Sequence, residues 1–289
     1  MERVKGDGIK GWLFLAPSFL GSCVFFILPF LVIVYYSMIF SPIKPDFVWL
    51  DNFKAVLTNS AFKLAAKNTL TFSGTAVPLA VVLSLLLASL LEAKIPGKSF
   101  MRTFFLSPLM VPVASIVLIW QVIFHYNGAL NELLVTKLGF VRIDWLKSSY
   151  NQVIVIVLFL WKNLGYNMIL FMAALNNMPK DLIEVAEVEG ASPLYTFFFV
   201  KLRYLSPTIL FVTILSLINS FKVFREVYML SGAYPFEGLY MLQHFMNNTF
   251  QSLDYQKLSA AAVIMAIAMV LIISILFFVE DRFGKDVEG

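Results

Sequence analysis

The chain has 289 residues, of which 60% are hydrophobic and only 14% are charged. A soluble domain of this length has too little interior to bury so much apolar surface, which excludes an ordinary soluble globular protein and indicates a protein whose solvent is lipid. The formal net charge of +4 is small. It favours loops that face anionic lipid and the cytoplasm over a nucleic-acid-binding surface.

Long apolar runs favour membrane-spanning helices over a β-barrel. In lipid, backbone N–H and C=O groups must be satisfied within the protein, which leaves helices or a closed barrel. Residues 260–279 are apolar almost without interruption, whereas a barrel strand is an alternating segment of about 10 residues. We therefore predict an all-α polytopic membrane protein, with residues 1–289 as a single transmembrane domain. Six stretches are long enough to span: 11–39, 68–92, 103–125, 152–175, 205–231 and 258–279.

The first stretch is long and lacks a small-residue cleavage site, so we expect it to remain attached rather than to be a removed signal peptide.

The distribution of Lys and Arg predicts the orientation. Six spans place both termini on one side of the membrane. Lys and Arg are more frequent in the segments that cytoplasmic termini would place inside, and the outer segment 232–256 has none. We predict a multi-pass protein of the bacterial cytoplasmic membrane with both termini in the cytoplasm.

Two outer segments, 50–66 and 239–253, have apolar residues at helical spacing. Each predicts a short amphipathic helix at the membrane interface. The pattern is equally compatible with capping of the bundle and with docking of a partner.

Features that could suggest chemistry do not form a catalytic or metal site. Gly97-Lys98-Ser99 resembles the end of a phosphate-binding P-loop, but that motif needs a Gly where Glu92 stands and a preceding strand. The two isolated histidines, His125 and His244, are expected at the interface rather than as metal ligands. The one cysteine, Cys23, excludes an internal disulfide. We expect no catalytic residue, no metal and no cofactor on this chain, and we expect that it is not an enzyme.

Residues 176–204, between the fourth and fifth spans, predict a rigid helix–turn–helix on the cytoplasmic side. Asp181 starts a capping-box-like helix over 182–189, and Gly190 can end that helix in the left-handed conformation. Pro193 suits the first turn of a second helix. The helix face that could contact another protein consists of Leu182, Val185, Ala186 and Glu189.

This loop resembles the cytoplasmic motif E-A-A-x-x-x-G-A of bacterial ABC importer permeases, in which a Phe follows seven residues after the Gly. Val185 replaces the middle Ala, Val200 stands where Ile is usual, and Arg203 stands where Pro is frequent, while Pro207 matches a later Pro. In that family the loop is the coupling helix that fits a groove on the ATPase subunit. The resemblance and the helix face imply ATPase coupling by Glu184, Ala186, Glu189, Gly190, Ala191 and Phe197.

The resemblance extends over almost the whole chain, to the sugar-type permeases of the maltose and glycerol-phosphate first-permease type. It implies the type I importer permease fold and a heterodimer with a second permease. It further implies two ATPase subunits, which bind ATP and Mg, and an extracellular solute-binding protein. The segments that carry it are Leu13 to Leu20, Pro29, Tyr36-Ser, Asn68-Thr-Leu, Phe105 to Pro108, Pro112, Trp120, Phe224 to Gly232 and Pro235.

Polar residues inside the fourth and fifth spans are candidates for solute contact, because such groups are costly in lipid and tend to face a cavity or a partner. Aromatic rings can stack on sugar C–H faces, and amides or charges can bind hydroxyls. In the resembled family, the solute site draws on these same helices. Lys222 and Arg225 could instead snorkel to the outer interface, and Arg225 could pair with Glu226 or with the partner permease. The candidates are Trp161, Asn163, Tyr166, Asn167, Asn219, Phe221, Lys222 and Arg225.

The leading hypothesis is a permease subunit that imports a sugar, with an oligosaccharide favoured, by alternating access driven by ATP hydrolysis in partner subunits. Glycerol phosphate or another small polar solute is an alternative, and an anionic solute would favour Lys222 and Arg225 as its partners. An ion-coupled secondary transporter would need acidic residues at mid-membrane. The second, third and sixth predicted spans have none centrally, which counts against that class.

Overall fold

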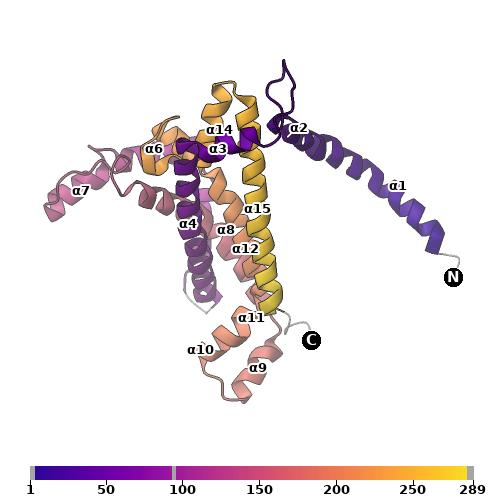
Figure 1. Cartoon of the computed structure of the whole chain (residues 1–289). Coiled ribbons are helices and arrows are strands. Elements are labelled where there is room, and N and C mark those ends of the chain that lie inside the picture. The colour runs from indigo at the N-terminus through magenta and orange to yellow at the C-terminus, as the bar shows by residue number, and fades with distance from the viewer. Residues whose placement is uncertain (1–3, 93–95, 285–289) are drawn as a thin grey trace. The chain divides into compact units, whose positions relative to one another are not determined.

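The computed structural model describes residues 4–92 and 96–284, and their regular elements are helices (Figure 1). An isolated bridge between Ile39 and Phe47 is the one β-type pairing in this part of the chain. The helices form two compact units, one of Met1–Phe62 with Met246–Met269 and one of Lys63–Phe245 with Val270–Gly289. The all-α fold is confirmed.

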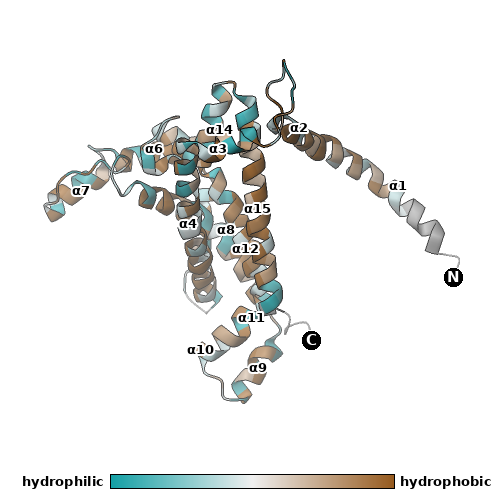
Figure 2. Cartoon of the chain, viewed as in Figure 1, coloured by the Kyte–Doolittle hydropathy of each residue, from teal (hydrophilic) through white to brown (hydrophobic). Residues whose placement is uncertain are grey.

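Six helical stretches are long and apolar enough to cross a membrane, which confirms the predicted number. Figure 2 shows the last helix, α15 (Tyr255–Gly284), as hydrophobic over most of its length, with polar residues at its C-terminal end. The six stretches are Phe14–Ser37, Ser60–Glu92, Val113–Leu138, Asn151–Asn176, Ser206–Ser231 and Tyr255–Arg282.

The third predicted span, 103–125, is not one helix. Helix α5 (Lys98–Met110) ends before Val111, and helix α6 (Val113–Phe124) begins after Pro112. Val111 is extended, with φ −88° and ψ 128°, because the ring of a proline disfavours helical backbone in the residue before it. The candidate spanning stretch begins with α6 and continues across a turn into α7 (Ala129–Leu138).

The first span is continuous despite its two prolines. It comprises α1 (Val4–Ser22), a π-helical turn (Cys23–Ile27) and α2 (Leu28–Ser37), with Pro17 inside α1. The widened turn lies directly before Pro29, whose missing N–H removes one helical hydrogen bond. None of the most apolar window of this span is buried within the chain, so lipid or another subunit must cover it.

The predicted interfacial helix 50–66 is two helices. Helix α3 (Asp51–Thr58) ends before Asn59, whose backbone is extended, and helix α4 (Ser60–Glu92) follows. The Asn59 side-chain oxygen accepts hydrogen bonds from the N–H groups of Ala61 and Phe62 at 2.9 and 3.1 Å. An asparagine cap therefore restarts the helix, as its acceptor oxygen satisfies N–H groups that the first turn leaves unpaired. The second outer segment, 239–253, contains helix α14 (Leu242–Gln251) as expected.

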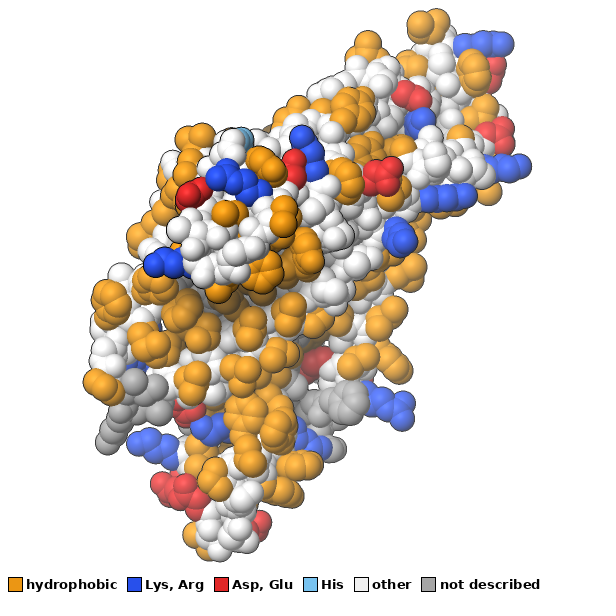
Figure 3. Space-filling view, turned by 90° about the vertical axis from the view of Figure 1, so that its left-hand side faces the viewer, with side chains coloured by type: hydrophobic (Ala, Val, Ile, Leu, Met, Phe, Trp, Pro, Cys, Tyr) orange, Lys and Arg blue, Asp and Glu red, His pale blue; other side chains and the backbone are white. Residues whose placement is uncertain are grey.

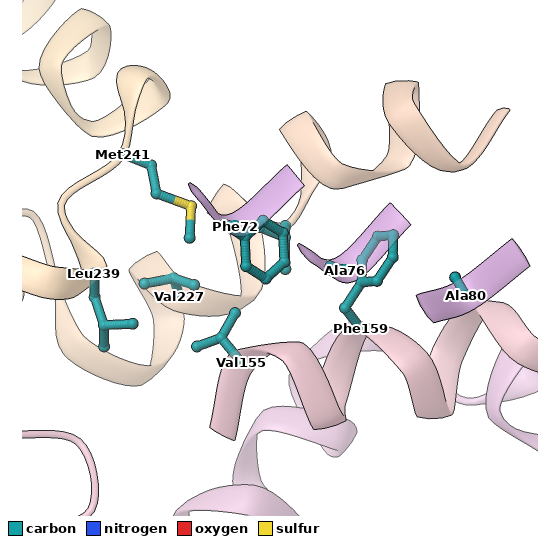
Figure 4. Close-up of a cluster of buried hydrophobic side chains, with 9 residues drawn as sticks. Phe72, Ala76, Ala80, Val155, Phe159, Val227, Leu239 and Met241 are labelled. Atoms are coloured by element: carbon teal, nitrogen blue, oxygen red, sulfur yellow. The ribbon is translucent and has the colours of Figure 1, made fainter. Parts of the chain in front are cut away.

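The core of the second unit lies between α4, α8 (Asn151–Asn176), α12 (Ser206–Lys222) and α13 (Phe224–Ser231). Figure 4 shows side chains from α4, α8 and α13 meeting with two residues of the segment before α14. The rings of Phe72 and Phe159 contact edge to face, with centroids 5.6 Å apart. The small residues Ala76 and Ala80 of α4 are fully buried in the same cluster.

Helices α5 and α8 cross at Gly165, which is buried within α8. A Cβ atom added there would lie 2.0 Å from the backbone oxygen of Phe105. This contact is with backbone, which cannot rotate away, so the crossing requires a residue without a side chain.

We expect Gly165→Ala to lower the free energy of unfolding by about 1–3 kcal/mol, because overpacking against fixed neighbours forces the helices apart. The melting temperature of the detergent-purified transporter measures this loss. Gly74→Ala is the matched control, since a Cβ at Gly74 in α4 meets nothing within 4 Å. Equal melting temperatures for the two variants would contradict the crossing described above.

Candidate functional site

A polar cavity of about 270 Å³ lies between α8 and the segment formed by α12 and α13. Lys162 and Asn163 stand near the middle of the 26-residue stretch Asn151–Asn176, so the cavity is central to that candidate span. Its apolar wall consists of Leu109, Leu158, Phe159 and Val223. Its polar wall consists of Lys162, Asn163, Asn219, Lys222, Arg225 and Glu226.

The structure brings together half of the predicted solute residues. Asn163, Asn219, Lys222 and Arg225 line the cavity, whereas Trp161, Tyr166, Asn167 and Phe221 are not among its lining residues. Asn167 is fully buried and donates a hydrogen bond to the Ser216 hydroxyl at 2.9 Å, which joins α8 to α12. Trp161 packs near Trp120, with ring centroids 6.3 Å apart.

The main polar contact of the cavity is an ion pair that the list of solute candidates missed. The ammonium of Lys162 donates to one carboxylate oxygen of Glu226. The Glu226 side chain is only 3% exposed and that of Lys162 26%. Glu226 therefore pairs with Lys162 on α8 rather than with its neighbour Arg225. The sequence contains a signal for this pair: Lys162 and Glu226 are opposite charges inside two candidate spans. Because lipid makes an unpaired charge costly, such charges are expected to pair.

Two amides form a second link across the cavity. Asn219 donates from its side-chain nitrogen to the side-chain oxygen of Asn163 at 2.9 Å. Asn163 in turn donates to the backbone oxygen of Phe159 at 2.8 Å, which fixes the orientation of its amide. Both amides stay partly exposed. They present fixed polar groups of the kind that hydrogen-bond hydroxyls.

Two cations of the cavity have no acidic partner. Helix α12 ends at Lys222 and α13 begins at Phe224, and Lys222 and Arg225 are both exposed at a spacing of three residues. Neither forms an ion pair with a carboxylate in the described part of the chain. Because Lys162 and Glu226 neutralise each other, the cavity carries an excess of positive charge.

His244 on α14 is fully buried rather than placed at an exposed interface. Its ring meets that of Phe224 edge to face at 4.7 Å, and its Nδ1 accepts the backbone N–H of Met241 at 3.3 Å. Burial lowers the pKa of His244 to about 4, so the ring is neutral at pH 7. No cluster of three or more His, Cys, Asp or Glu side chains that could hold a metal ion occurs within 4–92 and 96–284.

The loop between α8 and α12 contains the predicted first helix and glycine turn. Helix α9 spans Lys180–Val188, and Gly190 follows in the left-handed conformation with φ 77°. The N–H of Ala191 donates to the Ala186 oxygen at 2.9 Å, and the N–H of Gly190 donates to the Glu187 oxygen at 3.0 Å. These two bonds form a Schellman motif, which satisfies carbonyls that the helix end would leave unpaired.

The second half of the loop is not one regular α-helix. Ser192 caps helix α10 (Pro193–Tyr195) by accepting the Tyr195 N–H, with Pro193 in the first turn as predicted. A π-helical segment (Thr196–Lys201) and the short helix α11 (Leu202–Tyr204) then lead to α12.

This loop exposes apolar side chains. Val188 is 89% exposed, and the rings of Tyr195 and Phe199 stack at 4.5 Å while more than half exposed. Figure 3 shows acidic side chains beside hydrophobic ones at the lowest part of the view, where Figure 1 places α9 and α10. Of the predicted contact face, Leu182 and Val185 are exposed, but Ala186 is buried within the loop. Exposed apolar side chains gathered on one loop are typical of a surface that contacts another protein.

Polar contacts tie the loop to two spans. Lys201 forms an ion pair with Glu92, the last residue of α4, at 2.7 Å. The Tyr204 hydroxyl donates to the backbone oxygen of Asn177, just after α8, at 3.2 Å. These two contacts connect the loop to the ends of α4 and α8.

A helical chain with six candidate spans, a polar cavity between two of them and a helical loop that joins their ends has the architecture of a membrane transport subunit. The chain belongs to the family of binding-protein-dependent transport system inner membrane components, the permeases of ABC importers, whose model matches residues 80–289.

Comparison with known proteins gives relatives of nearly the same length. The multiple sugar-binding transport system permease of Streptococcus mutans is 30% identical over 96% of each chain. The trehalose/maltose transport system permease of Thermococcus litoralis is 29% identical over 96% of this chain and 95% of its own. Among solved structures, a bacterial ABC transporter involved in import of the acidic polysaccharide alginate matches with a TM-score of 0.82 at 21% identity. It covers 97% of this chain and 99% of that one, and it shows the fold alone.

Proposed function

We propose that the chain is the permease subunit of an importer that moves a sugar, with an oligosaccharide favoured, across the cytoplasmic membrane. The observation that carries this proposal is the cavity with two fixed amides, Asn163 and Asn219, in the middle of a candidate span. The names of relatives for trehalose/maltose, multiple sugars and arabinooligosaccharides support a sugar as the solute. The cavity also has an apolar wall, and a pocket that combines apolar walls with a few fixed polar groups suits a small polar ligand.

The proposed assembly contains a second permease, two ATPase subunits that bind ATP and Mg, and an extracellular solute-binding protein. The apolar first span, Phe14–Ser37, is consistent with contact to a second permease, because its own chain buries none of its most apolar window. A solved relative in the fold comparison is a complex with a periplasmic protein bound to an alginate pentasaccharide, which supports a binding-protein partner.

In this proposal, residues 176–204 face the cytoplasm and dock on an ATPase. ATP binding moves the ATPases, the loop follows, and the ties from Lys201 to Glu92 and from Tyr204 to Asn177 pass the movement to α4 and α8. The cavity residues on α8 then change their access from one side to the other. Glu184, Glu189 and the exposed apolar residues of α9 and α10 form the proposed docking surface, while Ala186, Gly190, Ala191 and Phe197 shape it.

Single cysteines test both the orientation and the docking surface. In a Cys23→Ser background, we expect Val188→Cys to react with a membrane-impermeant thiol reagent only after the cells are opened, and to crosslink to the ATPase. Lys137→Cys on α7 is the control, expected to react in intact cells without that crosslink. Labelling of Val188→Cys from outside would refute the orientation, and absence of the crosslink in the active transporter would refute docking at this surface.

A further inference from the structure

We infer that the transported solute is an anionic saccharide, a sugar that carries a carboxylate or a phosphate, and that Lys222 and Arg225 bind its anionic group. This inference rests on the proposed function and deepens it, because it assigns the charge of the solute in the same cavity. The polar wall holds three cations and one carboxylate. A neutral sugar would leave that imbalance in place.

The pairing inside the cavity identifies which cations are available. Lys162 is held by Glu226, so its charge is already compensated. Lys222 and Arg225 line the same cavity, are exposed to it and lack an ion-pair partner among the residues the structure places. The surroundings of a transmembrane cavity screen charge poorly, so two uncompensated cations attract an anion strongly.

The geometry of the two cations suits an oxyanion. They stand three residues apart across the junction between α12 and α13 at Val223, whose backbone is φ −61° and ψ −18°. Helical geometry at this spacing directs both side chains to one side. The planar guanidinium of an arginine donates two parallel hydrogen bonds to a carboxylate or phosphate, and a lysine adds a point charge beside it.

The rest of the cavity suits the hydroxyl groups of the same solute. The amides of Asn163 and Asn219 line the cavity and stay partly exposed, so they can bind hydroxyl groups. Glu226 is held by Lys162 and its second carboxylate oxygen is buried, so this carboxylate is not available to the solute.

Uptake by the complete transporter, reconstituted in liposomes with its binding protein, tests the inference. The probes are two matched pairs: trigalacturonate with its carboxyl-reduced neutral trisaccharide, and a sugar 6-phosphate with the free sugar. We expect uptake of one anionic member and little of its neutral partner. Lys222→Gln with Arg225→Gln should raise KM for that probe about tenfold or more, since each variant removes charge-assisted hydrogen bonds. Lys137→Gln, outside the cavity, should leave KM unchanged.

The possible uptake results separate the inference of an anionic solute from the proposed function as a sugar permease. Uptake of the uronate or of the phosphate identifies which anionic group is bound. Equal or better uptake of the neutral probes, with no change of KM in the double variant, overturns the inference and leaves the sugar permease in place. If the double variant loses its partner permease on gel filtration, the two cations serve the subunit interface and the inference is overturned. Failure to transport any of the four probes counts against the proposed function itself.

Discussion

A Gly190→Val variant is expected to insert into the membrane normally and to lose most of its uptake. Gly190 has φ 77°, a left-handed backbone that a β-branched residue adopts only at a cost of about 1–2 kcal/mol or more. A penalty of that size lowers the population of the turned loop roughly tenfold. Uptake by the reconstituted transporter, with the amount of inserted chain as reference, measures the loss.

Gly190→Asn is the matched control, because asparagine adopts the left-handed conformation far more readily than valine. A Cβ at Gly190 meets nothing within 4 Å, so neither variant introduces a clash at that atom. We expect the asparagine variant to keep most of its uptake. Normal uptake by the valine variant would refute coupling through this turn, and equal loss in both would show that side-chain bulk at the docking surface is the cause.

Removing one partner of the buried ion pair should cost more stability than any other single change considered above. Lys162→Met is expected to lower the free energy of unfolding by about 3–5 kcal/mol, because it leaves the Glu226 charge buried without compensation. The Glu226 side chain is only 3% exposed, so water cannot solvate it in place of the lysine. The melting temperature of the purified transporter reports the loss.

The double variant Lys162→Met with Glu226→Leu should recover much of that stability, since no buried charge remains. Lys147→Met is the control for loss of a cation alone. Its pair with Asp144 is 3.7 Å long and exposed, so we expect a change of about 1 kcal/mol or less. If the double variant is no more stable than Lys162→Met, the unpaired Glu226 charge is not the cause of the lost stability.

The local features of the chain were predictable because they depend on neighbours in the sequence. The six apolar stretches follow from composition, and the turn after α9 follows from one glycine after a short amphipathic helix. The third span was misplaced because the helix is interrupted at Val111, which is extended before Pro112, whereas Pro17, Pro78 and Pro108 lie inside helices. The outer helix 50–66 was divided by Asn59, whose capping role is also local.

By itself, the sequence determined the class of the protein: a six-span helical permease with a helical loop between its fourth and fifth spans. Only the tertiary structure decided which polar residues meet. Asn163 faces the cavity and Asn167, one turn further along the same face of α8, does not, because Asn167 is buried against α12 and donates to Ser216 there. The pair of Lys162 and Glu226 joins residues 64 positions apart. No local pattern encodes such a contact, since it depends on how two helices are oriented against each other.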